Sequence, residues 1–367
     1  MRIVLTGGGT GGHVYPALAA AKYIKKMEPA ADILFIGTQK GLESRIIPET
    51  GFPLETIAAR GFPRRISPDL IKTFYSTSRG SWEARRILKR YKPQVVMGTG
   101  GYVCGPVVFS AYLLGIPCLI HEQNVIPGMT NRLLFPFVKK VCLSFEASLK
   151  HFTDLSKTVV TGNPRASEVV DISRGEGIKA LGLNPNYKTV FIVGGSRGAW
   201  RINQCIMEIL PELVTLPGVQ WVYVTGQIYY DQVVSSEKIK EIMQNENVFI
   251  RSYIDQMPLA LAAADLMISR AGATMLAEIT ARGIPSVLIP SPNVTNNHQV
   301  LNARALSDEG AAEMILEKDI SGTLLMDTTA KMLQDENLLK AMSDKSRKLG
   351  YPDSAHMIYK EILECLS

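Results

Sequence analysis

Three features of the sequence predict an α/β protein of two domains, each a doubly wound parallel sheet. The chain has 367 residues, which is too long for one ordinary core. Short apolar runs alternate with helical segments, and this order favours parallel sheets. An apolar strand, a glycine-rich turn and a helix open the chain, and the same succession opens its second half.

The two halves repeat one plan. In the first, RIVLT leads into GGGTGGH and a helix expected from about Pro16. In the second, TVFIV leads into GGSRGA and a helix expected from about Arg201. A strand, a glycine turn and a helix begin a nucleotide-binding α/β unit. We therefore expect domains at residues 1–163 and 164–350.

The C-terminal residues 351–367 are expected to form a helix that returns to the first domain. Asp353 or Ser354 could cap this helix. Four apolar side chains fall roughly on one side of it: Met357, Ile358, Ile362 and Leu366.

Composition excludes several classes of protein. Apolar residues make up 46% of the chain and charged residues 20%, as in a globular protein. The five cysteines are scattered without a CxxC pair, so we expect reduced cytosolic thiols and no disulfide framework. Residues 93–120 carry no charge and are long enough to span a bilayer. Five glycines and two internal prolines there favour a buried strand, helix and strand instead.

The positive charge is concentrated in one segment. Residues 64–92 hold nine basic and only two acidic residues, a net charge of +7, so the rest of the chain sums to −1. A basic face implies an anionic partner, which we expect to be a membrane surface and not a nucleic acid. Leu70, Ile71, Phe74 and Tyr75 lie among the basic residues and could insert into that surface. The alternative is a solvated basic helix.

The first glycine loop, residues 7–12, satisfies the GxGxxG pattern. A dinucleotide site would also need an acidic residue where Gly37 and Thr38 end the second strand, so NAD binding is disfavoured. The loop can instead offer backbone N–H groups to an anion at a helix N-terminus. His13 follows there, and the positive helix end favours a neutral imidazole, as a general base requires. The alternative is a histidine that only caps the turn.

The second glycine loop, GGSRGA, fits two motifs. Residues 194–198 match the GxSxG nucleophile elbow of acyl hydrolases, which needs an acidic residue and a histidine in register downstream. His298 and His356 exist, but neither stands in a telling context. The repeat favours a phosphate-binding loop in which Ser196 and backbone N–H groups contact a diphosphate, with Arg197 nearby. A tight turn without a ligand is the alternative.

A third motif, SRAGATMLAEI, joins a strand end to a helix through one glycine. Ala273 and Thr274 begin that helix, at the end that binds anions. Glu278 lies four residues after Thr274, on the same side of the helix. A carboxylate there can accept both hydroxyls of a ribose; the alternative is a solvated helix residue.

Two polar segments are further candidates. Residues 121–124 (HEQN) end a buried strand, where ligands bind in parallel sheets, and His121 and Glu122 there rival His13 as the base. Residues 296–303 (NNHQVLNA) form a loop that enters a helix. They offer polar side chains for sugar hydroxyls: His298, Gln299 and Asn302. Ordinary turn chemistry is the alternative for both segments.

The sequence carries no Asp-x-Asp pair and no His/Cys cluster with ligand spacing. We therefore expect neither a metal nor a cofactor. A pyrophosphate leaving group would rely on helix N-termini, backbone N–H groups and arginine.

Eight motifs together resemble the MurG family, the UDP-N-acetylglucosamine:lipid I N-acetylglucosaminyltransferases of peptidoglycan synthesis. They follow the family's order over essentially the whole chain: TGGGTGGHVYP, GTGGYVCGP, HEQN, TGNPR, GGSRGA, YIDQM, SRAGATMLAEI and NNHQVLNA. The resemblance implies the GT-B fold, in which two Rossmann-like domains face a central cleft. It also implies inverting, metal-independent transfer of N-acetylglucosamine to the MurNAc 4-hydroxyl of lipid I, giving lipid II for cell-wall growth, cell shape and division.

The resemblance assigns roles to matching residues. His13 and Glu122 would be catalytic. Donor or acceptor would contact Thr10, Gly11, Gly12, Tyr102, Asn124, Arg165, Ser196, Ile254, Ala273, Thr274, Glu278 and Gln299. Met275 departs from the threonine of many relatives, and His298 from the glutamine of some. The implied partners are UDP-N-acetylglucosamine, lipid I, the anionic cytoplasmic face of the bacterial membrane and other cell-wall enzymes.

Three other functions remain open at this point. A UDP-N-acetylglucosamine 2-epimerase on the same fold would share the donor pocket but need its own acid–base carboxylates, and it would not need a basic segment. A non-catalytic nucleotide-binding module is disfavoured because both halves are complete. The third is a hydrolase with Ser196 as its nucleophile.

Overall fold

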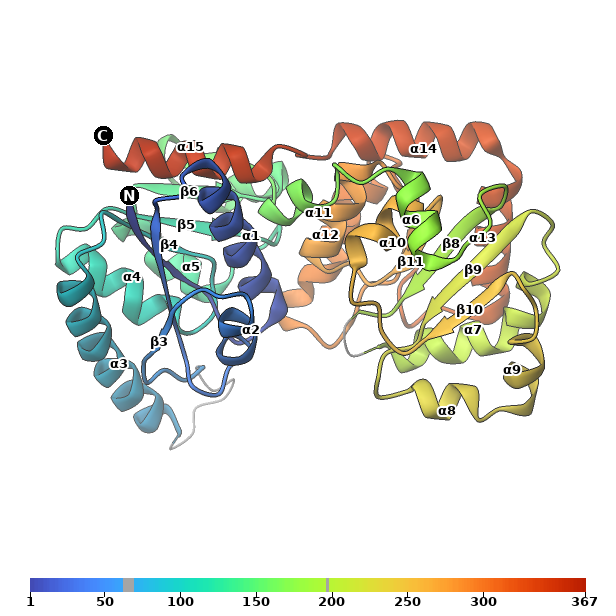
Figure 1. Cartoon of the computed structure of the whole chain (residues 1–367), viewed down its shortest axis with the longest axis horizontal. Coiled ribbons are helices and arrows are strands. Elements are labelled where there is room, and N and C mark those ends of the chain that lie inside the picture. Colours follow the sequence, from blue (N-terminus) through green and yellow to red (C-terminus); the bar gives the residue numbers. More distant parts are fainter. Residues whose placement is uncertain (62–68, 196–197) are drawn as a thin grey trace. The chain divides into compact units, whose positions relative to one another are not determined.

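The computed structural model describes residues 1–61, 69–195 and 198–367, the side chains of residues 69–71 left aside (Figure 1). The chain divides into two compact units. The first comprises Met1–Arg165 together with Asp353–Ser367, and the second comprises Ala166–Pro352. Each unit is a parallel sheet covered by helices, which confirms the predicted fold class.

In the described part of the first unit, seven parallel strands form one sheet in the order β3-β2-β1-β4-β5-β6-β7. They are β1 (Arg2–Thr6), β2 (Asp32–Gly37), β3 (Leu54–Thr56), β4 (Val95–Gly98), β5 (Cys118–Glu122), β6 (Lys140–Leu143) and β7 (Thr158–Val160). The helices are α1 (Gly11–Met27), α2 (Glu43–Glu49), α3 (Asp69–Tyr91), α4 (Cys104–Leu113), α5 (Met129–Leu134) and α15 (Ser354–Leu366). Short 3-10 turns occupy Phe135–Phe137, Glu146–His151 and Leu155–Lys157.

Both faces of this sheet are buried, as is usual for parallel strands with helices on each side. Successive side chains of β1 point to opposite faces. Ile3 and Leu5 pack with α1 and α15, whereas Val4 packs with α3 and α4. The alternation explains why the strands are continuous apolar runs in the sequence.

The described second unit holds six parallel strands in the order β10-β9-β8-β11-β12-β13. They are β8 (Lys188–Val193), β9 (Val219–Val224), β10 (Val248–Arg251), β11 (Leu266–Ser269), β12 (Ser286–Leu288) and β13 (Ala312–Met314). The longer helices are α6 (Arg174–Leu181), α7 (Trp200–Leu213), α11 (Ala273–Arg282), α12 (His298–Ser307), α13 (Gly322–Gln334) and α14 (Glu336–Lys348). The shorter ones are α8 (Tyr230–Val234), α9 (Glu237–Ile242), α10 (Met257–Ala263) and the 3-10 turn Thr295–Asn297; the turn Pro164–Glu168 joins the units.

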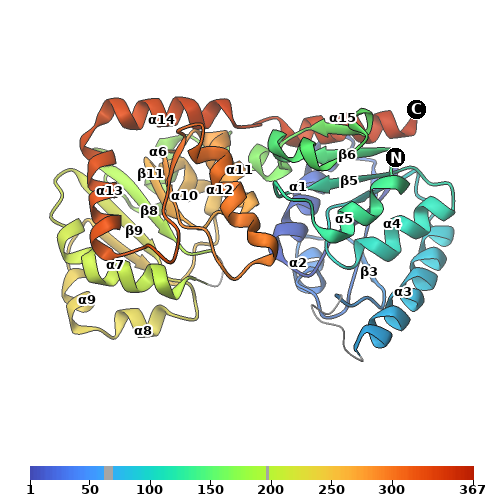
Figure 2. The same cartoon turned by 180° about the vertical axis from the view of Figure 1, so that it is seen from behind.

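The C-terminal helix α15 packs on α1 and on the sheet of the first unit, alongside β5 and β6 (Figures 1 and 2). Its buried apolar side chains are Ala355, Ile358, Ile362 and Cys365, whereas Leu366 is 36% exposed. The predicted face was therefore rotated, and Met357 and Leu366 do not belong to it. Asp353 is the N-cap, but its side chain makes no capping bond.

Helix α1 begins at Gly11, five residues before the predicted start at Pro16. Thr10 is the extended N-cap residue, and the helix continues through Pro16. The prediction placed Gly11 and Gly12 in a loop because glycine usually favours loops. These two residues instead form the first turn of the helix, where backbone N–H groups have no helical partner and glycine is tolerated. The consequence is that His13 lies within the first helical turn.

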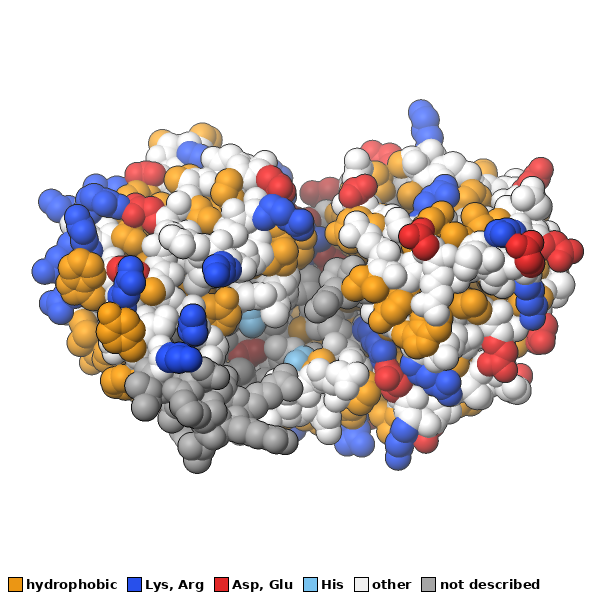
Figure 3. All heavy atoms as spheres, turned by 90° about the horizontal axis from the view of Figure 1, so that it is seen from below, with side chains coloured by type: hydrophobic (Ala, Val, Ile, Leu, Met, Phe, Trp, Pro, Cys, Tyr) orange, Lys and Arg blue, Asp and Glu red, His pale blue; other side chains and the backbone are white. Residues whose placement is uncertain are grey.

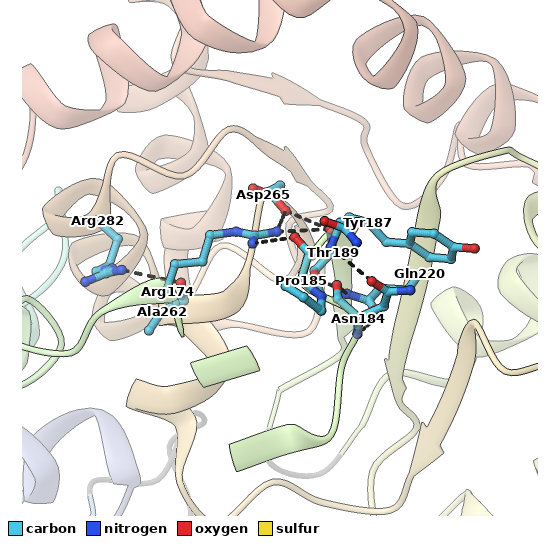
Figure 4. Close-up of polar contacts among 10 residues, drawn as sticks. Arg174, Asn184, Pro185, Tyr187, Thr189, Gln220, Ala262, Asp265 and Arg282 are labelled. Carbon is cyan, nitrogen blue, oxygen red and sulfur yellow. Dashed lines mark hydrogen bonds and ion pairs between the residues drawn. The ribbon is translucent and has the colours of Figure 1, made fainter. Parts of the chain in front are cut away.

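The amino ends of the strands in the second unit are tied by a polar network (Figure 4). Asp265 Oδ2 accepts from Arg174 Nη2 at 2.9 Å and from the Thr189 amide at 2.8 Å. Gln220 Nε2 donates to Thr189 Oγ1 and to the Asn184 carbonyl, both at 2.9 Å. Buried polar groups that have hydrogen-bond partners hold the strands in position. We therefore assign this end of the sheet a structural role.

The uncharged stretch 93–120 forms β4, α4 and β5, as predicted. Across the described ranges, no helix has both the length and the apolar character that crossing a bilayer requires. All five cysteines are buried and none is in a disulfide.

Candidate active site

Each sheet has one point at which the strand order reverses. In the first unit it lies between β1 and β4, and in the second between β8 and β11. Ligands of doubly wound sheets bind beyond the carboxyl ends of the strands at such points. The predicted glycine motifs follow these four strands, so the topology places them at the two reversal points.

The loop after β1 is braced by Glu43, which sequence reasoning missed. This carboxylate is 1% exposed and accepts from the Gly9 amide at 3.0 Å. It also accepts from the Thr38 amide at 3.0 Å and from the Thr38 hydroxyl at 2.7 Å. A Cβ built on Gly8 would lie 2.5 Å from Glu43 Oε1. In the sequence Glu43 looks like any acidic residue in a first helical turn.

The His13 imidazole is held at the mouth of α1. Its Nδ1 lies 3.1 Å from the Gly8 carbonyl oxygen and 3.2 Å from Thr10 Oγ1. A carbonyl only accepts, so in the neutral ring Nδ1 carries the proton and Nε2 is the basic nitrogen. This is the tautomer that a base facing a substrate hydroxyl requires.

Two glycines after β4 make room for that ring. Gly100 and Gly101 have φ of +101° and +82°, which other residues rarely adopt. A Cβ on Gly100 would lie 2.9 Å from His13 Cδ2, and one on Gly101 would lie 3.2 Å from His13 Nδ1. The motif GTGGYVCGP therefore serves the histidine sterically, a role that its sequence alone did not reveal.

The rival base His121 is fully buried. Its Nε2 lies 2.9 Å from the Gly162 carbonyl oxygen, and its Nδ1 lies 2.9 Å from Gln123 Nε2. Burial lowers the pKa of His121 to about 4. The ring is thus a neutral link between β5 and the chain after β7.

Glu122 is also buried, with 1% exposure. Its two oxygens accept from the amides of Asn124 and Gly128, each at 2.9 Å, and from Asn131 Nδ2 at 2.8 Å. Burial raises the pKa of the Glu122 carboxyl, and these hydrogen bonds oppose the rise. The carboxylate shapes the loop that begins at Asn124.

The other predicted residues of the first unit gather near the start of α1. Thr10, Gly11 and Gly12 form the N-cap and first turn. The Arg165 guanidinium lies 5.6 Å from the centroid of the Tyr15 ring, and that ring lies 3.1 Å from a Cβ built on Gly11. The ring of Tyr102 lies over Gly9, 2.9 Å from a built Cβ. Asn124 donates its backbone amide to Glu122 Oε1 at 2.9 Å.

In the second unit, a short segment connects the carboxyl end of β11 at Ser269 to the start of α11 at Ala273. Gly272 is the N-cap, and a Cβ built on it would meet no described atom within 4 Å. The Thr274 hydroxyl is buried and has no hydrogen-bond partner among the described residues. Glu278 is 3% exposed, so the alternative of a solvated helix residue is wrong. An open helix N-terminus with a buried, unpartnered hydroxyl suits an anionic group.

The remaining predicted residues lie at the start of α12 and in the segment after β10. Gln299, in the first turn of α12, accepts with its Oε1 from the Ser291 amide at 2.8 Å. In the turn before this helix, Asn296 and Asn297 both have left-handed φ, 54° and 49°. Two successive left-handed residues are strained, as binding loops often are. Ile254 is 8% exposed. Ser196 and Arg197 lie outside the described residues.

Comparison with known proteins identifies the family. The Glycosyltransferase family 28 N-terminal domain matches residues 3–143, and the Glycosyltransferase family 28 C-terminal domain matches residues 189–358. The chain is 48% identical over 360 residues, 98% of each protein, to UDP-N-acetylglucosamine--N-acetylmuramyl-(pentapeptide) pyrophosphoryl-undecaprenol N-acetylglucosamine transferase 1 of Bacillus cereus. The crystal structure of Acinetobacter baumannii MurG matches with a TM-score of 0.77 and 29% identity, covering 99% of both chains.

The chain belongs to the MurG family. UDP-GlcNAc 2-epimerase from Neisseria meningitidis has a similar fold, with a TM-score of 0.70, 14% identity and coverage of 99% of this chain and 100% of its own. At that identity the likeness shows the fold alone. The epimerase alternative is therefore less well supported than membership of the MurG family.

Proposed function

We propose that this MurG-family chain transfers N-acetylglucosamine from UDP-N-acetylglucosamine to the MurNAc 4-hydroxyl of lipid I, with inversion and without a metal ion. The names of its relatives support the substrates, since they state this donor and a pyrophosphoryl-undecaprenol acceptor. The His13 ring carries the chemical part of the proposal, because its Nδ1 is engaged by Gly8 and its Nε2 is the basic nitrogen.

In the proposed reaction, His13 Nε2 takes the proton of the acceptor hydroxyl as its oxygen attacks the anomeric carbon. The bond from that carbon to the UDP oxygen breaks, and UDP leaves with the electron pair. One in-line displacement inverts the anomeric configuration. A positioned base contributes roughly 10²–10⁴-fold. The diphosphate charge that develops is stabilised by the amides at the start of α11 and by the Thr274 hydroxyl.

The donor is assigned to the second unit. Glu278 accepts the ribose hydroxyls, the backbone of Ile254 meets uracil, and Gln299 contacts the sugar. The burial of Glu278 supports this role, since a dry carboxylate discriminates strongly for hydroxyl donors. Ser196 is assigned to the diphosphate, from its motif alone.

Glu122 is assigned a positioning role in place of base catalysis. Its oxygens already accept three hydrogen bonds of 2.8–2.9 Å, so taking a proton from a substrate hydroxyl would require that these be broken. Glu122 would instead hold Asn124 for substrate. This assignment predicts that Glu122→Gln keeps the pH dependence of kcat, whereas His13→Gln loses its acidic limb.

We also propose that the first unit binds the cytoplasmic face of the membrane peripherally. Helices α3 and α4 pack together, and both expose aromatic side chains. Phe74 and Tyr75 are 71% exposed and Trp82 is 64% exposed, while Phe109 and Tyr112 stack on α4. Figure 3 shows Lys and Arg side chains interspersed with hydrophobic ones on this unit. Arg64 and Arg65 of the basic segment 64–92 lie outside the described residues.

Vesicle binding tests the membrane proposal. Binding to anionic vesicles should weaken steeply as salt rises, because surface charges are screened. Phe74→Ser with Trp82→Ser should lower binding at fixed salt. Equal binding to neutral and anionic vesicles at low salt would contradict the proposal.

Acceptor dependence tests the transfer itself. Incubated with UDP-N-acetylglucosamine alone, the protein should leave the sugar unchanged. With a short-chain lipid I analogue it should release one UDP for each acceptor that gains N-acetylglucosamine, joined by a β-linkage. Formation of the 2-epimer without acceptor would replace the transferase with the epimerase alternative.

A further inference from the structure

A cationic pocket of about 930 Å³ lies in the first unit, and the proposed mechanism assigns no ligand to it. It is lined by the loop after β2, the segment after β3 and one face of α3. The charged residues that line it are Lys40, Arg60, Lys72, Arg79 and Glu83, which give it a net charge of +3. A concave site with this excess of positive charge suits a small polyanion.

The wall of the pocket is fixed by close packing of α3. Any Cβ on Gly80 would collide with the Ala58 carbonyl oxygen, so glycine lets the helix rest directly on that backbone. Glu83 Oε2 accepts from the Ala58 amide at 2.6 Å, and its Oε1 accepts from Arg79 Nε at 2.8 Å. The single carboxylate is therefore committed to structure, and the pocket is preformed.

Tyr102 connects the pocket to the loop that carries His13. Its ring lines the pocket and also covers Gly9, 2.9 Å from a built Cβ. Tyr75 lines the pocket from α3 and is 71% exposed, next to Phe74 on the proposed membrane surface. Contacts therefore link four features in order: the loop that carries His13, the ring of Tyr102, the basic side chains of the pocket and the exposed aromatic rings of α3.

The acceptor named for the relatives has the same order of chemistry: a sugar, a pyrophosphoryl group and an apolar undecaprenol. We propose that this pocket binds the pyrophosphoryl group of the acceptor, an inference that rests on the proposed function. Guanidinium and ammonium groups form strong charge-assisted hydrogen bonds with phosphate oxygens. The carboxylates of the pentapeptide are a weaker fit, because the peptide branches from the sugar and need not lie between sugar and lipid.

The test uses the full chain with UDP at saturation, so that the donor site is filled, and inorganic pyrophosphate as the probe. The variant is Lys40→Gln with Arg60→Gln, both exposed and both outside the basic segment 64–92. The matched control is Lys26→Gln, an exposed charge of the same unit in the last turn of α1. Pyrophosphate dissociation constants, acceptor KM and vesicle binding are measured for each.

We expect the double variant to weaken pyrophosphate binding tenfold or more and to raise acceptor KM tenfold or more. Donor KM and vesicle binding should stay within twofold, and the control should match the wild type. Unchanged pyrophosphate binding and acceptor KM would overturn the proposal. A second outcome would also overturn the proposal: the double variant raises acceptor KM, keeps pyrophosphate binding, and is inhibited less well by a phosphate-free muramyl pentapeptide that competes with the acceptor. The pocket would then bind the carboxylates of the peptide. A wild type that binds pyrophosphate through these residues but transfers nothing would support the anion site and reject the proposed function.

Discussion

The two reversal points share a topology but use their glycines differently. In the first unit, a Cβ on each glycine of residues 7–9 would come under 3.0 Å from a side chain of another element: Thr99, Glu43 and Tyr102. In the second unit, a Cβ on Gly194 or Gly198 would likewise collide, with Ala199 and with the Thr225 carbonyl oxygen, but Gly195 and Gly272 would meet no described atom within 4 Å. Similar motifs thus do different work. The first loop is a packed platform for His13, and the second leaves open backbone for a ligand.

The largest expected effect is on His13. The His13→Ala variant should lose roughly 10²–10⁴-fold in kcat, because the acceptor hydroxyl would lose its base. The acidic limb of the kcat profile should disappear with it. Steady-state kinetics across pH measure both, and His356→Ala, in the first turn of α15, serves as the control. A retained acidic limb would move the base elsewhere.

Paired alanine substitutions separate packing glycines from open ones. Gly101→Ala should destabilise the fold by about 2–5 kcal/mol, since its φ is +82° and the Cβ would collide with the Gly8 carbonyl oxygen. Gly272→Ala should cost under about 1 kcal/mol, because φ is −71° and the space is open. Urea denaturation measures both. Equal losses would erase the contrast between the two loops.

The buried His121 should make the fold sensitive to acid. Its pKa is about 4 in the folded state and roughly 6.5 when unfolded. As pH falls below 6.5 the unfolded state binds a proton that the folded state refuses, so stability is lost. The loss should reach about 3 kcal/mol by pH 4. Stability measured from pH 7 to 4 should be flatter for His121→Gln, and an identical slope would show that another group is responsible.

A smaller effect is expected at Glu278. Glu278→Ala should raise donor KM, because the donor would lose about 1–3 kcal/mol of binding free energy, the value of a hydrogen bond to a charged group. The preference for UDP-sugar over dUDP-sugar should fall with it. Glu241→Ala, an exposed carboxylate of the same unit, is the control. If the variant keeps the wild-type preference for UDP-sugar, Glu278 does not bind the ribose hydroxyls.

Strand and glycine patterns were sufficient to predict the fold class. The apolar runs have both faces buried, so strands such as β1 are strong signals, and the strands that open the two halves, β1 and β8, are each followed by a glycine turn. Local patterns were weaker at helix ends. The start of α1 was misplaced because Gly11 and Gly12 are helical, and the face of α15 was misjudged because the buried positions are Ile358 and Cys365, each next to a predicted residue, Met357 or Leu366, that is not buried.

The supports of the site could not be predicted. Glu43 braces the first loop from 34 residues away, and Asn131 reaches Glu122 from the next helix. Such bonds depend on which loops meet at a reversal point, and single-sequence patterns carry no information on that. The polar cluster HEQN was expected to meet ligands, and its pattern did not reveal that His121 and Glu122 are buried and hydrogen-bonded to neighbouring segments of the chain.

The division of labour between the units is tested most directly by donor affinity. Calorimetric titration with UDP-N-acetylglucosamine should give the same dissociation constant for His13→Ala as for the wild type. It should give a dissociation constant at least tenfold higher for Gly272→Ala, because the new methyl group would stand where we propose that the diphosphate approaches α11. At saturating donor, Gly272→Ala should recover most of kcat while His13→Ala does not. The reverse pattern, with affinity lost at His13 and kept at Gly272, would contradict the account.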